Sequence, residues 1–266
     1  METIKMWDSV PGMCEEEPVL EFYPADQKTS AATVIVFPGG GYSHRAPHEG
    51  QPFAEFFNSL GMNAFVCQYR VSPHRFPLEL LDARRAVRYV RYHAEKFGID
   101  PNRVGVMGSS AGGHLSALVS TYTAPIDFEN IDEIDKESPI PNATILCYAV
   151  IHHPDEMEIT HRGSYRNLLG TDDESVAKAY SPDLLVYDTT PMAFIWHTMD
   201  DQTVDVRNSY LYASALKAHN ISHELHVFPN GRHGLGLASA APHVAQWTTL
   251  LKNWLIYIGW AAEYIN

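Results

Sequence analysis

The 266-residue chain has few cysteines, few basic residues and no long apolar run. Its three cysteines, Cys14, Cys67 and Cys147, are too sparse for a disulfide framework, and no CxxC pair is present to bind a metal. No stretch of about 18 apolar residues occurs, so we expect no membrane-spanning segment. The chain opens without a basic segment followed by an apolar one, so we expect no secretory signal and a reducing cytoplasm as the compartment.

Positive charge is also scarce, with 19 Lys and Arg against 32 Asp and Glu and a formal net charge of −13. This balance argues against nucleic acid and against anionic membrane surfaces as partners. Apolar residues make up 45% of the chain, an ordinary globular composition that excludes a disordered protein. The composition therefore indicates a soluble protein that acts on small or neutral partners.

Short apolar runs alternate with helical patterns along the whole chain. Six runs that are apolar nearly throughout predict strands buried on both faces of a parallel sheet, at 33–37, 63–69, 103–107, 144–150, 192–197 and 223–228. Two earlier runs, 4–7 and 19–23, could add antiparallel strands at the edge of the sheet. We predict one α/β domain over residues 1–266, with a mostly parallel sheet of about eight strands and helices on both faces.

A segment between two predicted strands, 80–97, and a segment after the last one, 244–258, predict amphipathic helices, and Gly98 is the expected stop of the first. The arginines of the first helix are expected on a solvated face: Arg84, Arg85, Arg88 and Arg91. The acidic stretch 126–142 precedes a strand. We therefore expect it far from the chemistry, where it contributes surface charge only, because ligands bind beyond the carboxyl ends of parallel strands.

The motif G-x-S-x-G occurs at residues 108–112, directly after the predicted strand 103–107 and before a helical segment. A strand, a sharp turn and a helix lift the central serine above a sheet, and glycines are needed where Cβ atoms would collide. Ser110 is therefore the candidate nucleophile, and Ser109 occupies the variable position. A plain glycine-rich turn is the structural alternative.

A serine nucleophile needs a base and an acid that orients the base, and this architecture orders them serine, acid, histidine. His233 lies between Arg232 and Gly234 in a loop after the last predicted strand. Asp200 and Asp201 follow the strand 192–197, and spacing alone hardly separates them. The acyl-transfer oxyanion needs N–H donors, which Ala111 and the glycine loop 38–42 would supply. No GK[ST] follows this loop, which disfavours a phosphate cradle.

Other polar residues lie on loops that face the predicted site. His114 is expected to be a packed or hydrogen-bonded structural histidine. The histidines at 152, 153 and 161 could suggest a metal, but no carboxylate or thiol pattern supports one, so we expect no metal. Four residues could shape the pocket without an assigned role: Tyr42, His44, Glu49 and Arg70. The stretch 151–190 could form a small lid.

These motifs resemble the esterase/lipase branch of the α/β-hydrolases, in particular small acetylxylan-esterase-like carbohydrate esterases. The resemblance runs from about residue 32 to 258 and is carried by 37–42, 49–50, 69–71, 107–115, 197–204 and 231–235. It implies a catalytic triad of Ser110, His233 and Asp201, the last chosen over Asp200 by the D-x-x-V pattern. The resemblance also implies an oxyanion hole formed by Gly40, Gly41 and Ala111.

Two positions depart from the family pattern. Pro38 stands where lipase-type members have histidine, as is common in the carbohydrate-esterase-like group. Asp205 follows the D-x-x-V valine where proline is frequent, and it could cap the next helix.

The resemblance implies a serine esterase without a cofactor that removes short acyl groups, such as acetyl, from sugars or oligosaccharides. A prolyl-type peptidase and an amidase or lactonase on the same fold stay open, and so does a non-catalytic binding protein. Homo-oligomers are common among such esterases, but the sequence does not decide this. No specific substrate-binding residue is assigned.

Overall fold

A single mixed sheet runs through the protein in this computed structural model, which describes residues 1–12, 17–129, 131–153, 159–171 and 173–263. Its 8 strands lie in the order β1-β2-β4-β3-β5-β6-β7-β8. The strands are β1 (Glu2–Lys5), β2 (Val19–Tyr23), β3 (Thr33–Phe37), β4 (Asn63–Gln68), β5 (Val104–Ser109), β6 (Ala143–Cys147), β7 (Met192–Thr198) and β8 (His223–Phe228).

The two N-terminal strands form an antiparallel edge, since β1 pairs antiparallel with β2 and β2 with β4. The pairs from β4 through β3, β5, β6 and β7 to β8 are parallel. The six strands that the sequence predicts are therefore confirmed, and the two earlier runs do add the antiparallel edge, although β1 begins two residues before the run 4–7. The carboxyl ends of the parallel strands meet at one edge of the sheet, and the loops that carry the candidate site leave from there.

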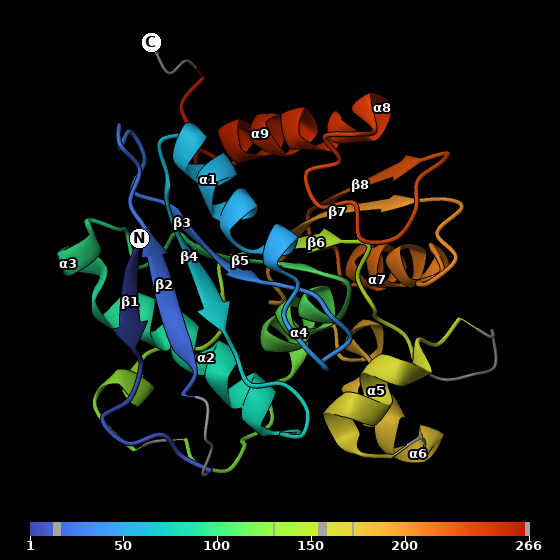
Figure 1. Cartoon of the computed structure of the whole chain (residues 1–266), viewed down its shortest axis with the longest axis horizontal. Helices are drawn as coiled ribbons and strands as arrows, with labels where there is room; N and C mark the ends of the chain where they lie inside the picture. The colour runs from blue at the N-terminus through green and yellow to red at the C-terminus, as the bar shows by residue number, and fades with distance from the viewer. Residues whose placement is uncertain (13–16, 130, 154–158, 172, 264–266) are drawn as a thin grey trace.

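Helices cover both faces of the sheet (Figure 1). On one face, α1 (Gln51–Ser59) and α9 (Trp247–Tyr257) pack on the side chains of Val34 and Val36, with the short α8 (Pro242–Ala245) before α9. On the other face, α2 (Leu78–Tyr92) and α4 (Ser110–Thr121) pack on Ile35 and Phe37, and α7 (Arg207–Ala218) packs beside them. The alternation within β3 follows from the two-residue period of a strand and divides the core into two layers.

The helix predicted over 80–97 is two helices, because α2 ends at Tyr92 and α3 (Ala94–Phe97) follows it. Gly98 caps α3 in the left-handed conformation, as expected from the sequence. The helix predicted over 244–258 is likewise divided, into α8 and α9.

Two more helices, α5 (Arg162–Leu169) and α6 (Glu174–Ala177), lie between β6 and β7. Among the described residues, we find no helix with the length and apolar character needed to cross a membrane. Cys67 and Cys147 are buried free thiols, and Cys14 lies outside the described residues.

The prediction of a solvated arginine face on α2 is wrong. Arg84, Arg85, Arg88 and Arg91 are all buried, because the segment 126–142 folds over them. Its carboxylates form ion pairs with three of the four, and the distance from Arg85 Nη1 to Asp135 Oδ1 is 2.8 Å. The acidic stretch therefore does more than contribute surface charge, since it closes the core over α2.

We expect Arg85→Ala to lower the free energy of unfolding by about 3 kcal/mol, because it removes the 2.8 Å ion pair of the buried Asp135 carboxylate and leaves only the longer contact to Arg88 at 3.9 Å. Arg85 also donates to the Met6 carbonyl, which would lose its partner. Denaturant unfolding measures the change, and Lys136→Ala, which breaks an exposed pair with Glu133, is the control. Equal effects of the two substitutions would contradict this view of the α2 ion pairs.

A buried carboxyl group on α2 makes stability depend on pH. The side chain of Glu79 is fully buried, and neither oxygen has a hydrogen-bond partner among the residues that the structure describes. Burial raises its pKa from the ordinary 4.5 to about 8, with a further contribution from Asp82. The folded protein thus holds this proton from pH 4.5 to about 8 while the unfolded chain releases it, so stability falls as the pH rises through that range.

Glu79→Gln should therefore raise the free energy of unfolding at pH 8.5, by about 2 kcal/mol or more, and change it little at pH 5. Denaturant unfolding at the two pH values measures the difference. Glu95→Gln on the exposed surface of α3 serves as the control and should have no such pH dependence. An equal effect of Glu79→Gln at both pH values would contradict the assignment.

Candidate active site

The candidate nucleophile lies in the sharp turn between β5 and α4. Ser110 is the first residue of α4 and has a φ of 52°, in the left-handed region that a residue with a side chain rarely adopts. Its side chain is almost buried, with 7% of the residue exposed. Such strain persists only where the surrounding structure holds it, and it raises the serine above the carboxyl end of β5.

Glycines on both sides of Ser110 allow that close packing. A Cβ atom at Gly108 would lie 2.0 Å from the Gly112 carbonyl oxygen, and one at Gly112 would lie 2.1 Å from the Phe37 carbonyl oxygen. These contacts are backbone on backbone, so no side-chain rotation could relieve them. The G-x-S-x-G spacing is thus explained by the crossing of α4 over β3 and β5.

Three loops bring the predicted triad residues together. His233 Nε2 lies 2.8 Å from Ser110 Oγ, and His233 Nδ1 lies 2.6 Å from Asp201 Oδ2. Ser110 follows β5, Asp201 follows β7 and His233 follows β8. Since the carboxylate can only accept, Nδ1 carries the proton and Nε2 presents its lone pair to the serine hydroxyl. This is the arrangement that a serine–histidine–aspartate relay requires.

Two backbone N–H groups and two histidines hold the Asp201 carboxylate in place. Its Oδ1 accepts hydrogen bonds from the backbone N–H groups of Thr203 and Val204, and its Oδ2 lies 3.3 Å from Nε2 of the buried His197. Burial opposes the charged form, but the hydrogen bonds from His197 and His233 outweigh it and hold the pKa of Asp201 well below its usual value. The carboxylate therefore stays ionised beside His233.

Asp200 binds the loop that carries His233 and not the imidazole itself. Its Oδ1 accepts the backbone N–H of Gly231 at 2.6 Å, and its Oδ2 accepts from the Asn230 side chain at 3.3 Å. It thus braces the start of the loop that carries His233 and does not contact the imidazole. These hydrogen bonds distinguish the roles of Asp200 and Asp201, which sequence spacing alone could not do.

The glycine loop lies against the same hollow as the triad. Gly40 and Gly41 have φ values of 127° and 63°, and both line the hollow that also contains Ser110 and His233. In the described part of the chain, neither of their N–H groups has an acceptor, whereas the N–H of Gly39 is bound to Glu49. The N–H of Ala111 is in the first turn of α4, where backbone donors have no partner within the helix. The three N–H groups predicted for the oxyanion are thus available, and their role stays a prediction.

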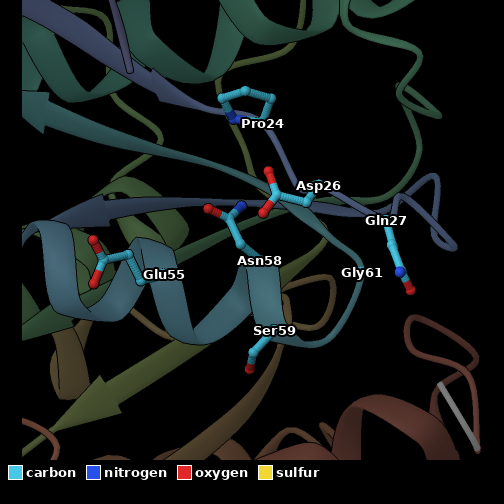
Figure 2. Close-up of a pocket in the computed structure, with 7 residues that line it drawn as sticks. All are labelled: Pro24, Asp26, Gln27, Glu55, Asn58, Ser59 and Gly61. Atoms are coloured by element: carbon cyan, nitrogen blue, oxygen red, sulfur yellow. The ribbon is translucent and has the colours of Figure 1, made fainter. Parts of the chain in front are cut away.

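The hollow at the triad is small, with a volume of about 250 Å³. It is lined by Gly40, Gly41, Ala46, His48, Glu49, Ser110, His161, Thr203, His233 and Gly234. A larger hollow of about 470 Å³ lies elsewhere, between α1 and the loop after β2 (Figure 2). Its lining includes Asp26, Glu55 and Ser59 but no histidine that could activate a nucleophile, so we do not place the chemistry there.

Three further histidines named in the sequence analysis lie near the site or in the core. His114 is buried between the Tyr42 hydroxyl and the Tyr180 carbonyl, and burial lowers its pKa to about 4, so it is the structural histidine that the sequence predicts. His152 pairs with Asp183, and we find no cluster of metal-ligating side chains among the described residues. His161 caps α5 and reaches the hollow at Ser110.

The proposed lid segment 151–190 contains α5 and α6, although residues 154–158 and 172 lie outside the described part. Asn167 on α5 donates to the Gly41 carbonyl at 2.8 Å, so the segment packs against the glycine loop. Whether it acts as a lid stays a prediction.

Sequence reasoning gave no role to several residues that surround the triad. The sequence marks Glu49 only as a residue that could shape the pocket, and it gives no signal of a role for the side chains of Tyr148 and His197. Tyr148 follows β6 with a φ of 38°, and nothing in its neighbours along the chain signals this. Arg70, also a pocket candidate, does not line the hollow at Ser110 and is instead buried in an ion pair with Asp82.

Comparison with known proteins gives a family and several close relatives. The BD-FAE family model matches residues 20–216. Endo-1,4-beta-xylanase B of Butyrivibrio fibrisolvens is 40% identical over 77% of this chain, and acetylxylan esterase of Xylanibacter ruminicola is 33% identical over 86% of it. The chain spans 33% and 46% of the lengths of these two relatives.

Among solved structures, an acetyl ester-xyloside bifunctional hydrolase from Caldicellulosiruptor lactoaceticus is 44% identical and superposes with a TM-score of 0.91. The match covers 98% of this chain and 97% of that one.

The mostly parallel sheet, with a strained serine after β5 and a histidine after β8, defines an α/β-hydrolase. The comparisons agree with this fold and confirm the resemblance to carbohydrate-esterase-like hydrolases. The chain belongs to the BD-FAE family.

We expect Asp201→Asn to lower kcat for ester hydrolysis by roughly 10³–10⁴-fold, because the amide can present an N–H to Nδ1 and favour the wrong imidazole tautomer. Asp200→Asn should cost less than about tenfold, since the amide keeps an oxygen that can accept the Gly231 N–H. Steady-state kinetics of both variants measure the difference. A larger loss in Asp200→Asn than in Asp201→Asn would contradict the geometry.

Proposed function

We propose that this chain is a serine carboxylic-ester hydrolase that removes short acyl groups, acetyl above all, from sugars or oligosaccharides. The observation that carries the proposal is the continuous hydrogen-bonded line from Asp201 through His233 to Ser110, at a hollow lined by the glycine loop. A binding protein would have no need for this alignment of an acid, a base and a strained serine.

The proposed reaction has two halves. His233 Nε2 takes the proton of Ser110 Oγ while that oxygen attacks the ester carbonyl, and the oxyanion is bound by the N–H groups of Gly40, Gly41 and Ala111. The tetrahedral intermediate collapses, His233 returns its proton to the leaving alcohol, and an acyl-enzyme remains. Water, deprotonated by His233, attacks the acyl-enzyme. The bond between Ser110 Oγ and the acyl carbon breaks, His233 returns the proton to Ser110 Oγ, and the acid leaves. Asp201 stays ionised and stabilises the imidazolium in both halves.

The size of the hollow supports a short acyl group. Its volume of about 250 Å³ must hold the acyl group and part of the alcohol, and it lies below the range of about 300–1,000 Å³ that is usual for ligand pockets. Beside the glycine loop, Tyr42, His114, Ser164 and Tyr165 leave no room for a water molecule. These packed side chains leave no space for an acyl chain on that side of the glycine loop.

The surface of the hollow is mostly apolar, but three side chains at it carry groups that can bind the hydroxyls of a sugar alcohol. His48, His161 and Thr203 line it and offer hydrogen-bonding groups for hydroxyls. The backbone N–H of Ser164 donates to His161 Nδ1, so the neutral ring of His161 carries its proton on Nε2 as a donor. The names of the relatives, an acetylxylan esterase and an acetyl ester-xyloside hydrolase, support the same substrate class.

We expect kcat/KM on p-nitrophenyl esters to be highest for acetyl and to fall at least about tenfold by octanoyl, because the small hollow excludes longer chains. Ser110→Ala should lower the activity on acetyl by roughly 10⁴–10⁶-fold. Acetate released from acetylated xylo-oligosaccharides, measured with the same two proteins, tests the sugar part.

Highest activity on octanoyl would contradict the short acyl group. Equal activity of Ser110→Ala and the parent protein would contradict the serine mechanism. Activity on p-nitrophenyl acetate without acetate release from the oligosaccharides would restrict the proposal to a general short-acyl esterase.

A further inference from the structure

A buried carboxylate and a buried phenol join the two loops that flank Ser110. Glu49, with 2% of the residue exposed, accepts the Gly39 N–H on Oε2 at 2.9 Å and the Tyr148 hydroxyl on Oε1 at 2.7 Å. The Tyr148 oxygen in turn accepts the Gly236 N–H at 2.9 Å. One unbroken chain of hydrogen bonds thus runs from the residue before Gly40 to the loop that contains His233.

The Tyr148 ring also packs against the imidazole of His233. Its centroid lies 5.1 Å from that of His233 at an interplanar angle of 71°, and 5.0 Å from that of Trp196 at an interplanar angle of 90°. The Tyr148 backbone N–H donates to the Trp196 carbonyl at 2.8 Å. Contacts with Trp196 on β7 therefore hold both the ring and the backbone of Tyr148, and its hydroxyl points at Glu49.

The surroundings of the Tyr148 hydroxyl make it the donor of this pair. Burial raises the pKa of Tyr148 well above its usual value, and the neighbouring Glu49 carboxylate raises it further. The phenol therefore keeps its proton and donates a hydrogen bond to Glu49. A buried carboxylate is costly unless its oxygens accept hydrogen bonds, and both oxygens of Glu49 do. A Cβ atom at Gly39 would lie 2.5 Å from Oε2, so only glycine lets the carboxylate come this close.

We propose that Glu49 and Tyr148 are positioning residues that fix the glycine loop and the His233 loop relative to each other around Ser110. The bond to Gly39 fixes the Pro38–Gly39 peptide, which directly precedes the peptides that carry the N–H groups of Gly40 and Gly41. The bond to Gly236 and the ring contact fix the place of the His233 imidazole. This inference rests on the proposed function. Neither residue is the base or the acid, because both nitrogens of His233 already bind Ser110 and Asp201.

The hydrogen-bond chain from Gly39 through Glu49 and Tyr148 to Gly236 is called the bridge below. Two conservative substitutions each remove a different hydrogen bond of the bridge. Tyr148→Phe removes the hydroxyl and keeps the ring against His233, which leaves the Gly236 N–H without its acceptor. Glu49→Gln keeps the shape but supplies only one accepting oxygen for the two donors. For p-nitrophenyl acetate we expect each to lower kcat about 10–100-fold with KM changed less than about threefold, because a small misplacement of reacting groups costs about this much.

The double variant Glu49→Gln/Tyr148→Phe should be no more than about threefold slower than the slower single variant, because both changes cut the same bridge. The control for a lost buried hydrogen bond is Ser120→Ala, which removes the contact to Thr144 between α4 and β6. Its kcat should stay within about twofold of the parent protein. If either bridge variant loses no more kcat than Ser120→Ala, the positioning role is wrong.

Amide hydrogen exchange tests the bridge independently of activity. Exchange at Gly236 should accelerate at least about tenfold in Tyr148→Phe, and exchange at Gly39 should do so in Glu49→Gln. Unchanged exchange at both amides would overturn the bridge even in an active enzyme. Accelerated exchange in a protein without Ser110-dependent hydrolysis would instead keep the bridge and overturn the proposed function.

Discussion

The site depends on one steric constraint, the crossing of the first turn of α4 over the ends of β3 and β5. At this crossing Gly108 and Gly112 pack backbone on backbone, with no space for a Cβ atom at either position. The turn between them can close only with Ser110 in the left-handed region. This constraint places the serine hydroxyl and the N–H of Ala111 at one point above the sheet, and the other loops are arranged around that point.

Buried hydrogen bonds extend this constraint to the flanking loops. Asp201 is held by two backbone N–H groups and by His197, and it orients His233. Glu49 and Tyr148 then connect the glycine loop to the loop of His233. The polar groups around Ser110 therefore form a largely preorganised set, which is the condition for stabilising a developing charge without rearrangement.

The sequence could predict what local patterns encode. The apolar strand runs, the strand–turn–helix setting of Ser110 and a histidine after the last strand all follow from short segments. The arginines of α2, such as Arg85, look like a solvated face because periodicity does not show that 126–142 folds over them. The bridge from Glu49 to Tyr148 joins side chains 99 positions apart, and no local pattern marks either as a partner of the other.

The most direct test of the account is covalent labelling with a fluorophosphonate, followed by peptide mass spectrometry. We predict a single label on Ser110, since its hydroxyl is hydrogen-bonded to His233 Nε2 and lies at the hollow that the glycine loop lines. The labelling rate should fall at least about 100-fold in His233→Ala. No labelling, or labelling of the neighbouring Ser109 instead, would contradict the assignment of Ser110 as the nucleophile.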